Sequence, residues 1–279
     1  MIARIRALGW ALAFLCGGFF SSVAIVHQFR SDTRLTTPGG AFSFALLQTA
    51  VLLAVFGGLT LAAGKQLGLR AADFGLRPVG RGFRGFARGL SIGVGLGALA
   101  MAAAVPIGGA SWRAGGGGFR DWLQAVGVLT AVFFPAAFAE ELAFRGVPLV
   151  VLSRAMGRRA ALVGLGLLFG LAHLLNPGAT PLAIGNIVLA GVFLGLVFLS
   201  GGGLWSSTGA HLGWNLTLAS LGATVSGLPL PLPALSYVPG HPVWLTGGRF
   251  GPEGGVVATL CLLLGCLVMS RHLDREPLV

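Results

Sequence analysis

PLAIGNIVLAGVFLGLVFLS, residues 181–200, is a stretch of twenty residues without one charged side chain. A helix of this length crosses the ~30 Å hydrocarbon core of a bilayer. The whole chain of 279 residues is 55% hydrophobic and only 10% charged, whereas about a quarter of the residues are charged in an ordinary soluble domain. The apolar runs therefore predict an integral membrane protein.

Seven further runs with few charged residues accompany this one. They lie at 7–29, 41–63, 88–106, 123–143, 160–175, 204–225 and 255–270. Backbone N–H and C=O groups find no water inside a bilayer, and these runs lack the alternating pattern of a membrane β-strand. We therefore expect an all-α, polytopic bundle of about eight transmembrane helices, which forms a single membrane domain over residues 1–279.

The basic residues predict the orientation of the chain and argue against nucleic acid as a partner. The formal net charge is +11, but the basic residues stand mainly in short connections between apolar runs, where they orient the protein and attract anionic lipids. With the N-terminus inside, 14 basic residues are cytoplasmic and five are outside, namely Arg30, Arg34, Arg113, Arg120 and Arg249. This distribution predicts that both termini are cytoplasmic. Lys65 is the only lysine, and together with abundant Gly and Ala this favours a prokaryotic plasma membrane.

Two connections differ from the rest. Segment 65–88 places Arg77, Arg81, Arg84 and Arg88 at helical spacing, which predicts either a short interfacial helix on anionic lipid or a solvated basic loop. Segment 226–254 is too rich in Pro and Gly to be a membrane helix. We expect it to be an extracytoplasmic loop, which either caps a site or only links two spans.

Three short motifs place costly polar groups inside the apolar runs, in a predicted catalytic core at about 123–225. An ionisable group in hydrocarbon costs roughly 2.5–3.5 kcal/mol on insertion scales, so its presence needs a compensating reason. In FAEELAFRG, 138–146, Glu141 and Arg145 are four residues apart and can pair, whereas Glu140 is turned ~100° away and stays free to react. The other two motifs are FGLAHLL, 169–175, with Phe169 and His173 on one face, and GAHLGWNLT, 209–217, with His211 and Asn215 on one face.

Structural explanations compete with a catalytic one at each motif. A Glu–Arg pair can lock topology, a lone histidine usually bonds a neighbouring helix, and an asparagine can fasten two helices together. Because all these residues fall in the middle and late runs, a shared site in the bundle interior explains them more simply.

The three motifs, in this order and spacing, resemble those of the CAAX prenyl protease and bacteriocin-processing (CPBP) family of intramembrane proteases. The E-E-x-x-x-R motif corresponds to Glu140, Glu141 and Arg145, the F-x-x-x-H motif to Phe169 and His173, and the H-x-x-x-N motif to His211 and Asn215. The resemblance covers about residues 70–225 and implies an eight-helix bundle with a cavity in which a peptide bond is cut.

The resemblance also implies a role for each residue. Glu140 with His173 would activate a water molecule, and Glu141 with Arg145 would orient the site. His211 and Asn215 would stabilise the oxyanion of the tetrahedral intermediate. Members have been described both as metal-free glutamate proteases and as metalloproteases; if zinc binds, its ligands would be Glu140, His173 and His211. No cofactor is therefore certain, and the metal-free route is slightly favoured.

The substrate and the competing functions stay open at this stage. A peptide or membrane protein, prenylated or not, is the expected partner, and the oligomeric state is unknown. Intramembrane Glu, His and Arg also build proton relays, so a proton-coupled transporter is an alternative. A catalytically inactive immunity or chaperone-like membrane protein is another, although the complete set of six polar residues favours activity.

Overall fold

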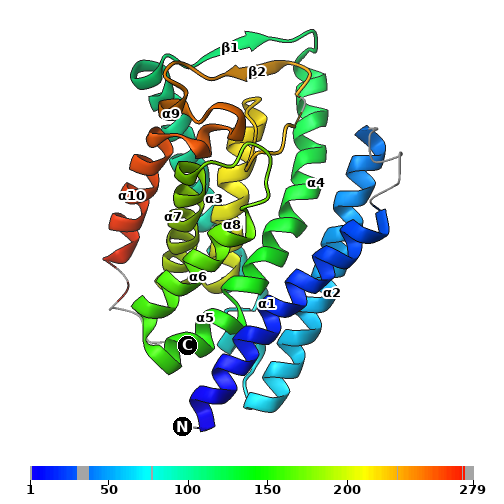
Figure 1. The fold of residues 1–279 in the computed structure, drawn as a ribbon, viewed down its shortest axis with the longest axis vertical. Helices are drawn as coiled ribbons and strands as arrows, with labels where there is room; N and C mark the ends of the chain where they lie inside the picture. The colour runs from blue at the N-terminus through cyan, green and yellow to red at the C-terminus, as the bar shows by residue number, and fades with distance from the viewer. Residues whose placement is uncertain (1, 30–37, 77, 231, 272, 274–279) are drawn as a thin grey trace.

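The structure is a computed structural model that describes residues 2–29, 38–76, 78–230, 232–271 and 273. The predicted basic positions Arg30, Arg34, Arg77 and Arg275 lie outside the described residues. Most of the chain is α-helical (Figure 1). The long helices are α1 (Ile2–Phe29), α2 (Pro38–Leu67), α3 (Val79–Gly108), α4 (Phe119–Phe144), α5 (Val147–Met156), α6 (Arg158–Ala172), α7 (Pro181–Val197), α8 (Gly203–Ser220) and α10 (Val256–Ser270).

Each apolar run predicted from the sequence overlaps one of these helices, although three runs extend three to five residues past the helix end. By length and composition, four helical stretches of the described chain are suited to cross a membrane: Ser43–Leu67, Ala71–Gly108, Phe119–Met156 and Pro181–Ser220. Leu8–Gly18 and Val256–Ser270 are shorter apolar helices. An all-helical membrane bundle agrees with this pattern, whereas the number of eight spans and the side on which each terminus lies remain predictions.

Helices α3 and α8 pack with their backbones almost in contact, which positions the helix that carries His211. A Cβ atom added to Gly93 of α3 would lie 2.1 Å from the carbonyl oxygen of Ala210, and one added to Gly209 of α8 would lie 2.3 Å from that of Phe86. Only glycine permits this approach, as in other small-residue interfaces between membrane helices. The seam of glycines therefore holds α8 rigidly against α3.

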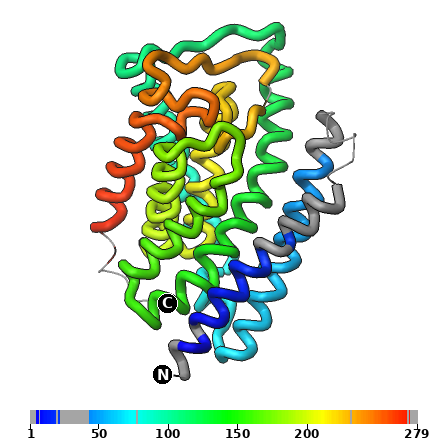
Figure 2. The backbone as a smooth tube through the Cα atoms, in the orientation of Figure 1, coloured from blue at the N-terminus to red at the C-terminus, as the bar shows by residue number. Residues whose placement is uncertain are grey.

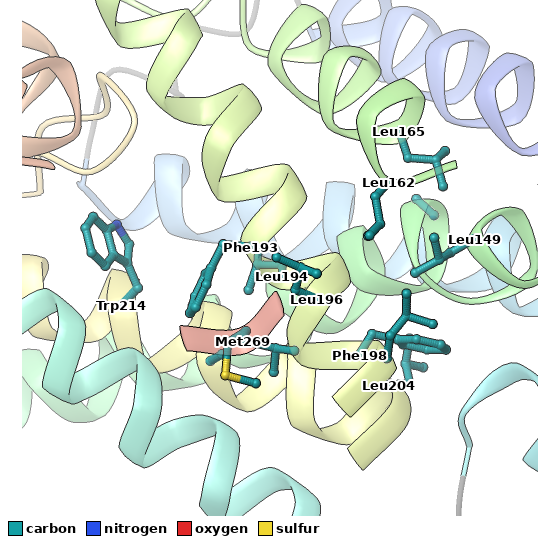
Figure 3. Close-up of a cluster of buried hydrophobic side chains, with 14 of the residues drawn as sticks. Leu149, Leu162, Leu165, Phe193, Leu194, Leu196, Phe198, Leu204, Trp214 and Met269 are labelled. Atoms are coloured by element: carbon teal, nitrogen blue, oxygen red, sulfur yellow. The ribbon is translucent and has the colours of Figure 1, made fainter. Parts of the chain in front are cut away.

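The main apolar core lies where α5, α6, α7 and α8 meet. Figure 3 shows its side chains, which include Leu149, Leu162, Leu165, Phe193, Leu194, Leu196, Phe198 and Leu204, all buried. Helices α1 and α2 lie side by side along one flank and contact the rest of the bundle mainly through α4 and α5 (Figure 1). The site motifs thus belong to the inner helices.

A small antiparallel sheet covers one end of the bundle, which the all-α expectation did not include. Strand β1 (Ser111–Ala114) pairs with β2 (Leu235–Val238), with Ser111 opposite Val238. The indole N–H of Trp112 donates to the carbonyl oxygen of Leu221, and that of Trp122 donates to the carbonyl oxygen of Ser220. These bonds satisfy carbonyl groups that the end of α8 leaves unpaired.

Segment 226–254 folds back across this end instead of hanging free as a simple link (Figure 2). Beside β2 it contains α9 (Val243–Thr246) and the 3₁₀ turns η4 (Gly248–Phe250) and η5 (Pro252–Gly254). The chain before α3 also differs from expectation. After the 3₁₀ turn η2 (Ala71–Phe74), residues 79–88 are the first turns of α3 and form no separate short helix or loop, because the helix continues without a break to Gly108.

Candidate active site

The last turn of α4 carries a buried ion pair, as its spacing predicts. Arg145 Nη1 lies 2.9 Å from Glu141 Oε1, and the two side chains are 2% and 0% exposed. Arg145 Nη2 also donates to the carbonyl oxygen of Gly191 on α7, at 3.1 Å. Two charges so deeply buried tolerate the loss of solvent only because each has a partner. The pair therefore ties the end of α4 to α7.

His211 joins this pair from α8 and also faces Glu140. Its Nδ1 lies 2.9 Å from Glu141 Oε1, and because an ionised carboxylate only accepts hydrogen bonds, Nδ1 carries a proton there. Its Nε2 lies 3.9 Å from Glu140 Oε2. Glu141 thus orients the imidazole, and the second ring nitrogen points toward the other carboxylate.

Glu140 is the accessible carboxylate of the site. Its side chain is 37% exposed, in contrast to the fully buried Glu141 beside it. Its Oε2 atom is nevertheless buried and has no hydrogen-bond partner among the described residues. A buried carboxylate oxygen without a partner is costly, so Glu140 Oε2 marks a place where a water or a substrate group can bind.

His173 reaches the site from the end of α6, where it is the residue that follows the last helical residue, Ala172. Its Nδ1–H donates to the carbonyl oxygen of Phe169 at 2.8 Å, since a carbonyl oxygen only accepts. This bond leaves Nε2 with a free lone pair, which suits a base or a metal ligand. The expected helical face is therefore present, although His173 caps the helix and does not lie within it.

The ring of Phe169 lies beside both histidines and Arg145. Its centroid lies 4.8 Å from that of His173 and 6.1 Å from that of His211. The guanidinium carbon of Arg145 lies 4.4 Å above the same ring. Phe169 is 3% exposed, so both histidines and Arg145 lie against one buried apolar ring.

Asn215 lies one turn after His211 on α8, half-buried. Within the described part of the chain its side-chain amide makes no hydrogen bond, so no hydrogen bond joins it to the other site residues. Its N–H groups are available to a ligand.

Glu253 is a buried carboxylate near the site that the sequence motifs did not single out. It is 4% exposed, in η5 of segment 226–254, and His173 is close enough for its charge to act on the Glu253 carboxyl. Burial raises the pKa of this carboxyl, while hydrogen bonds from Ser226 and Trp214 act in the opposite direction. The chain has only eight acidic residues, and this scarcity was the one signal that could have pointed to it.

The residues named as possible zinc ligands fit a metal by type but not by placement. Imidazole nitrogens and a carboxylate are common ligands of zinc, and each histidine has its Nδ1 engaged by an oxygen, as in many metal sites. However, no three His, Cys, Asp or Glu side chains among the described residues are arranged to hold a metal ion. Glu140 and His211 form a close pair, but the three donors together do not.

A family model described as type II CAAX prenyl endopeptidase Rce1-like matches residues 122–217. The matched segment covers about a third of the chain, runs from α4 to α8, and includes all six polar residues of the three motifs. The expected resemblance to the CAAX protease family is therefore confirmed over this segment, and it indicates a peptidase of the membrane. No match was found among curated proteins or solved structures.

Proposed function

We propose that this protein is an intramembrane endopeptidase that hydrolyses a peptide bond of a membrane-associated or C-terminally processed peptide. One observation carries the proposal. His211 Nε2 lies 3.9 Å from Glu140 Oε2, and this buried carboxylate oxygen has no hydrogen-bond partner in the part of the protein that the structure describes. The family match over the same helices supports the reaction class. A cell membrane, in a prokaryote, is the proposed location, with anionic lipids around the basic start of α3.

The proposed reaction begins with a water molecule bound at Glu140 Oε2. Glu140 takes a proton from this water, and the oxygen attacks the carbonyl carbon of the scissile peptide bond. The free Nε2 of His173 is a second acceptor for a proton. When the C–N bond breaks, the proton held by the site passes to the leaving amine nitrogen, so the products are a carboxylate and an amine.

His211 and Asn215 are the proposed donors to the oxyanion that forms on the substrate carbonyl. His211 donates from Nε2 when both ring nitrogens carry a proton, and Glu141 fixes the ring through Nδ1. Asn215 offers amide N–H groups that no protein group occupies. Removing one donor of this kind costs about 10²–10³ in kcat in well-studied enzymes.

Glu140→Gln tests the proposal most directly. The amide cannot accept a proton from water, so cleavage of a quenched peptide in detergent is expected to fall by at least about 10²-fold. Asp121→Asn is the matched control, because Asp121 is an exposed carboxylate that caps α4 through the N–H of Gly118. Equal turnover in wild type and Glu140→Gln would refute the peptidase, and proton flux in liposomes that survives this substitution would favour a transporter.

A chelator decides between the two chemical routes. Full activity of purified protein that contains no zinc by mass spectrometry supports the metal-free glutamate route. Activity that is lost with chelator and restored by zinc supports a metal route, which would require donors to move from the arrangement described above.

A further inference from the structure

Segment 226–254 carries a carboxylate to which the proposed mechanism assigns no role. Glu253 lies in η5, immediately before α10, and is almost completely buried. Burial of a carboxylate is unfavourable unless it binds several donors. The donors that surround Glu253 therefore indicate its role.

Three donors converge on the side chain of Glu253. The indole N–H of Trp214 donates to Oε1 at 3.0 Å, and the backbone N–H and the hydroxyl of Ser226 both donate to Oε2. The backbone of Glu253 is held as well, because its carbonyl oxygen accepts from the side-chain amide of Asn186 at 2.7 Å. Asn186 is itself fixed by the hydroxyl of Thr259. Glu253 thus has one defined position.

These partners lead to both histidines of the site. Trp214 is on α8, three residues after His211 and next to Asn215. On the other side, the carbonyl oxygen of Ser226 accepts from the side-chain amide of Asn176 at 2.8 Å, and the backbone N–H of Asn176 donates to the carbonyl oxygen of His173. A continuous chain of hydrogen bonds therefore joins α8 to the end of α6 through Glu253.

The apolar contacts of the segment follow the same route. Phe250, three residues before Glu253, is 1% exposed and belongs to a small cluster with Phe169, Ala183 and Ile187. Phe169 is also the residue whose carbonyl oxygen binds the His173 ring. The segment thus supports His173 by packing as well as by hydrogen bonds.

We propose that Glu253 is a positioning residue, which ties the end of α6 to α8 and so sets the spacing between His173 and the His211–Asn215 face. The proposal rests on the proposed function, since the spacing matters for catalysis only if both faces act on one substrate. A carboxylate suits this task because it accepts from all three donors. Glutamine in its place turns its N–H₂ group toward a donor and leaves one buried donor without a partner.

The test compares three variants with wild type: Glu253→Gln, Trp214→Phe and the control Asp121→Asn. For the first two, kcat on a quenched peptide is expected to fall about 10- to 100-fold, because small displacements of catalytic groups have effects of this size, while KM stays within about twofold of wild type. Amides of residues 173–180 are expected to exchange hydrogen faster in both. The double variant is expected to be no slower than Glu253→Gln alone, since both remove the same connection. Asp121→Asn is expected to change neither property.

Each alternative outcome is distinguishable. If hydrogen exchange at residues 173–180 is unchanged in Glu253→Gln, Glu253 does not tie the end of α6 to α8, whatever the activity of the variant. Faster exchange with an unchanged kcat also overturns the positioning role. Trp214→Phe keeps the test valid should Glu253→Gln fail to fold, because it removes only one of the three bonds. Cleavage by Glu140→Gln as fast as by wild type refutes the proposed function itself, and hydrogen exchange then still tests the connection.

Discussion

The two histidines of the candidate site are held in different ways. His211 lies within a long helix, is 8% exposed, and bonds a buried carboxylate that is itself paired with Arg145. His173 follows the end of α6, is half-buried, and bonds a backbone carbonyl of its own helix. The first is fixed by charges and by the α3–α8 seam, whereas the second depends on a segment that enters from outside the helical core. The site therefore combines a rigid half with a half that segment 226–254 supports.

We expect the largest effect on stability from the loss of Arg145, in the half of the site around His211. Arg145→Ala leaves Glu141 buried without its cation, and removing one partner of a buried pair costs about 3–5 kcal/mol. We expect a loss of this size in the free energy of unfolding, measured in detergent with denaturant. Arg120→Ala, exposed in the first turn of α4 and outside the site, is the control. A loss in unfolding free energy of at most about 1 kcal/mol, as for an exposed ion pair, would contradict the claim that this buried pair stabilises the half of the site around His211.

The second effect comes from the aromatic ring of Phe169, which contacts residues of both halves of the site. Phe169→Leu keeps an apolar side chain but removes the ring contacts with Arg145, His173 and His211, each worth about 0.5–1.5 kcal/mol. We expect a loss of about 1.5–4 kcal/mol in unfolding free energy together with a lower kcat. Phe193→Leu is the matched control, because Phe193 is equally buried but lies in the main apolar core, away from the histidines. An equal fall of kcat in the two variants would show that packing alone matters.

The half of the site that segment 226–254 supports is expected to depend on pH through Glu253. Burial raises the pKa of Glu253 above its ordinary value of 4.5, so between these two values the folded protein binds more protons than the unfolded chain. The contribution of Glu253 to stability is therefore greatest below pH 4.5 and falls as pH rises through the native pKa, by about 1.4 kcal/mol per pH unit within that window.

The difference in unfolding free energy between wild type and Glu253→Gln, followed from pH 4 to pH 8, isolates this contribution. We expect the difference to shift against the wild type as pH rises. A difference that is constant, or that shifts in favour of the wild type, would contradict a raised pKa.

The amino-acid sequence by itself determined the helical class and the local part of the site. Long apolar runs predict helices because only internal hydrogen bonds satisfy a backbone in lipid, and a spacing of four places Glu141 beside Arg145 on any helix. The three motifs also predicted which six polar residues to consider. All of these properties depend on neighbours within one or two turns.

Only the tertiary structure decided which residues meet across the bundle. Nothing in the spacing of Glu140 and His211 predicts that His211 bonds Glu141 and faces Glu140, or that the Phe169 ring lies beside both histidines. The role of segment 226–254 was equally open, because its Pro and Gly residues exclude a membrane helix without defining a path. Its path depends on long-range contacts, such as those of Glu253 with Trp214 and Ser226, and these exist only once the helices have packed.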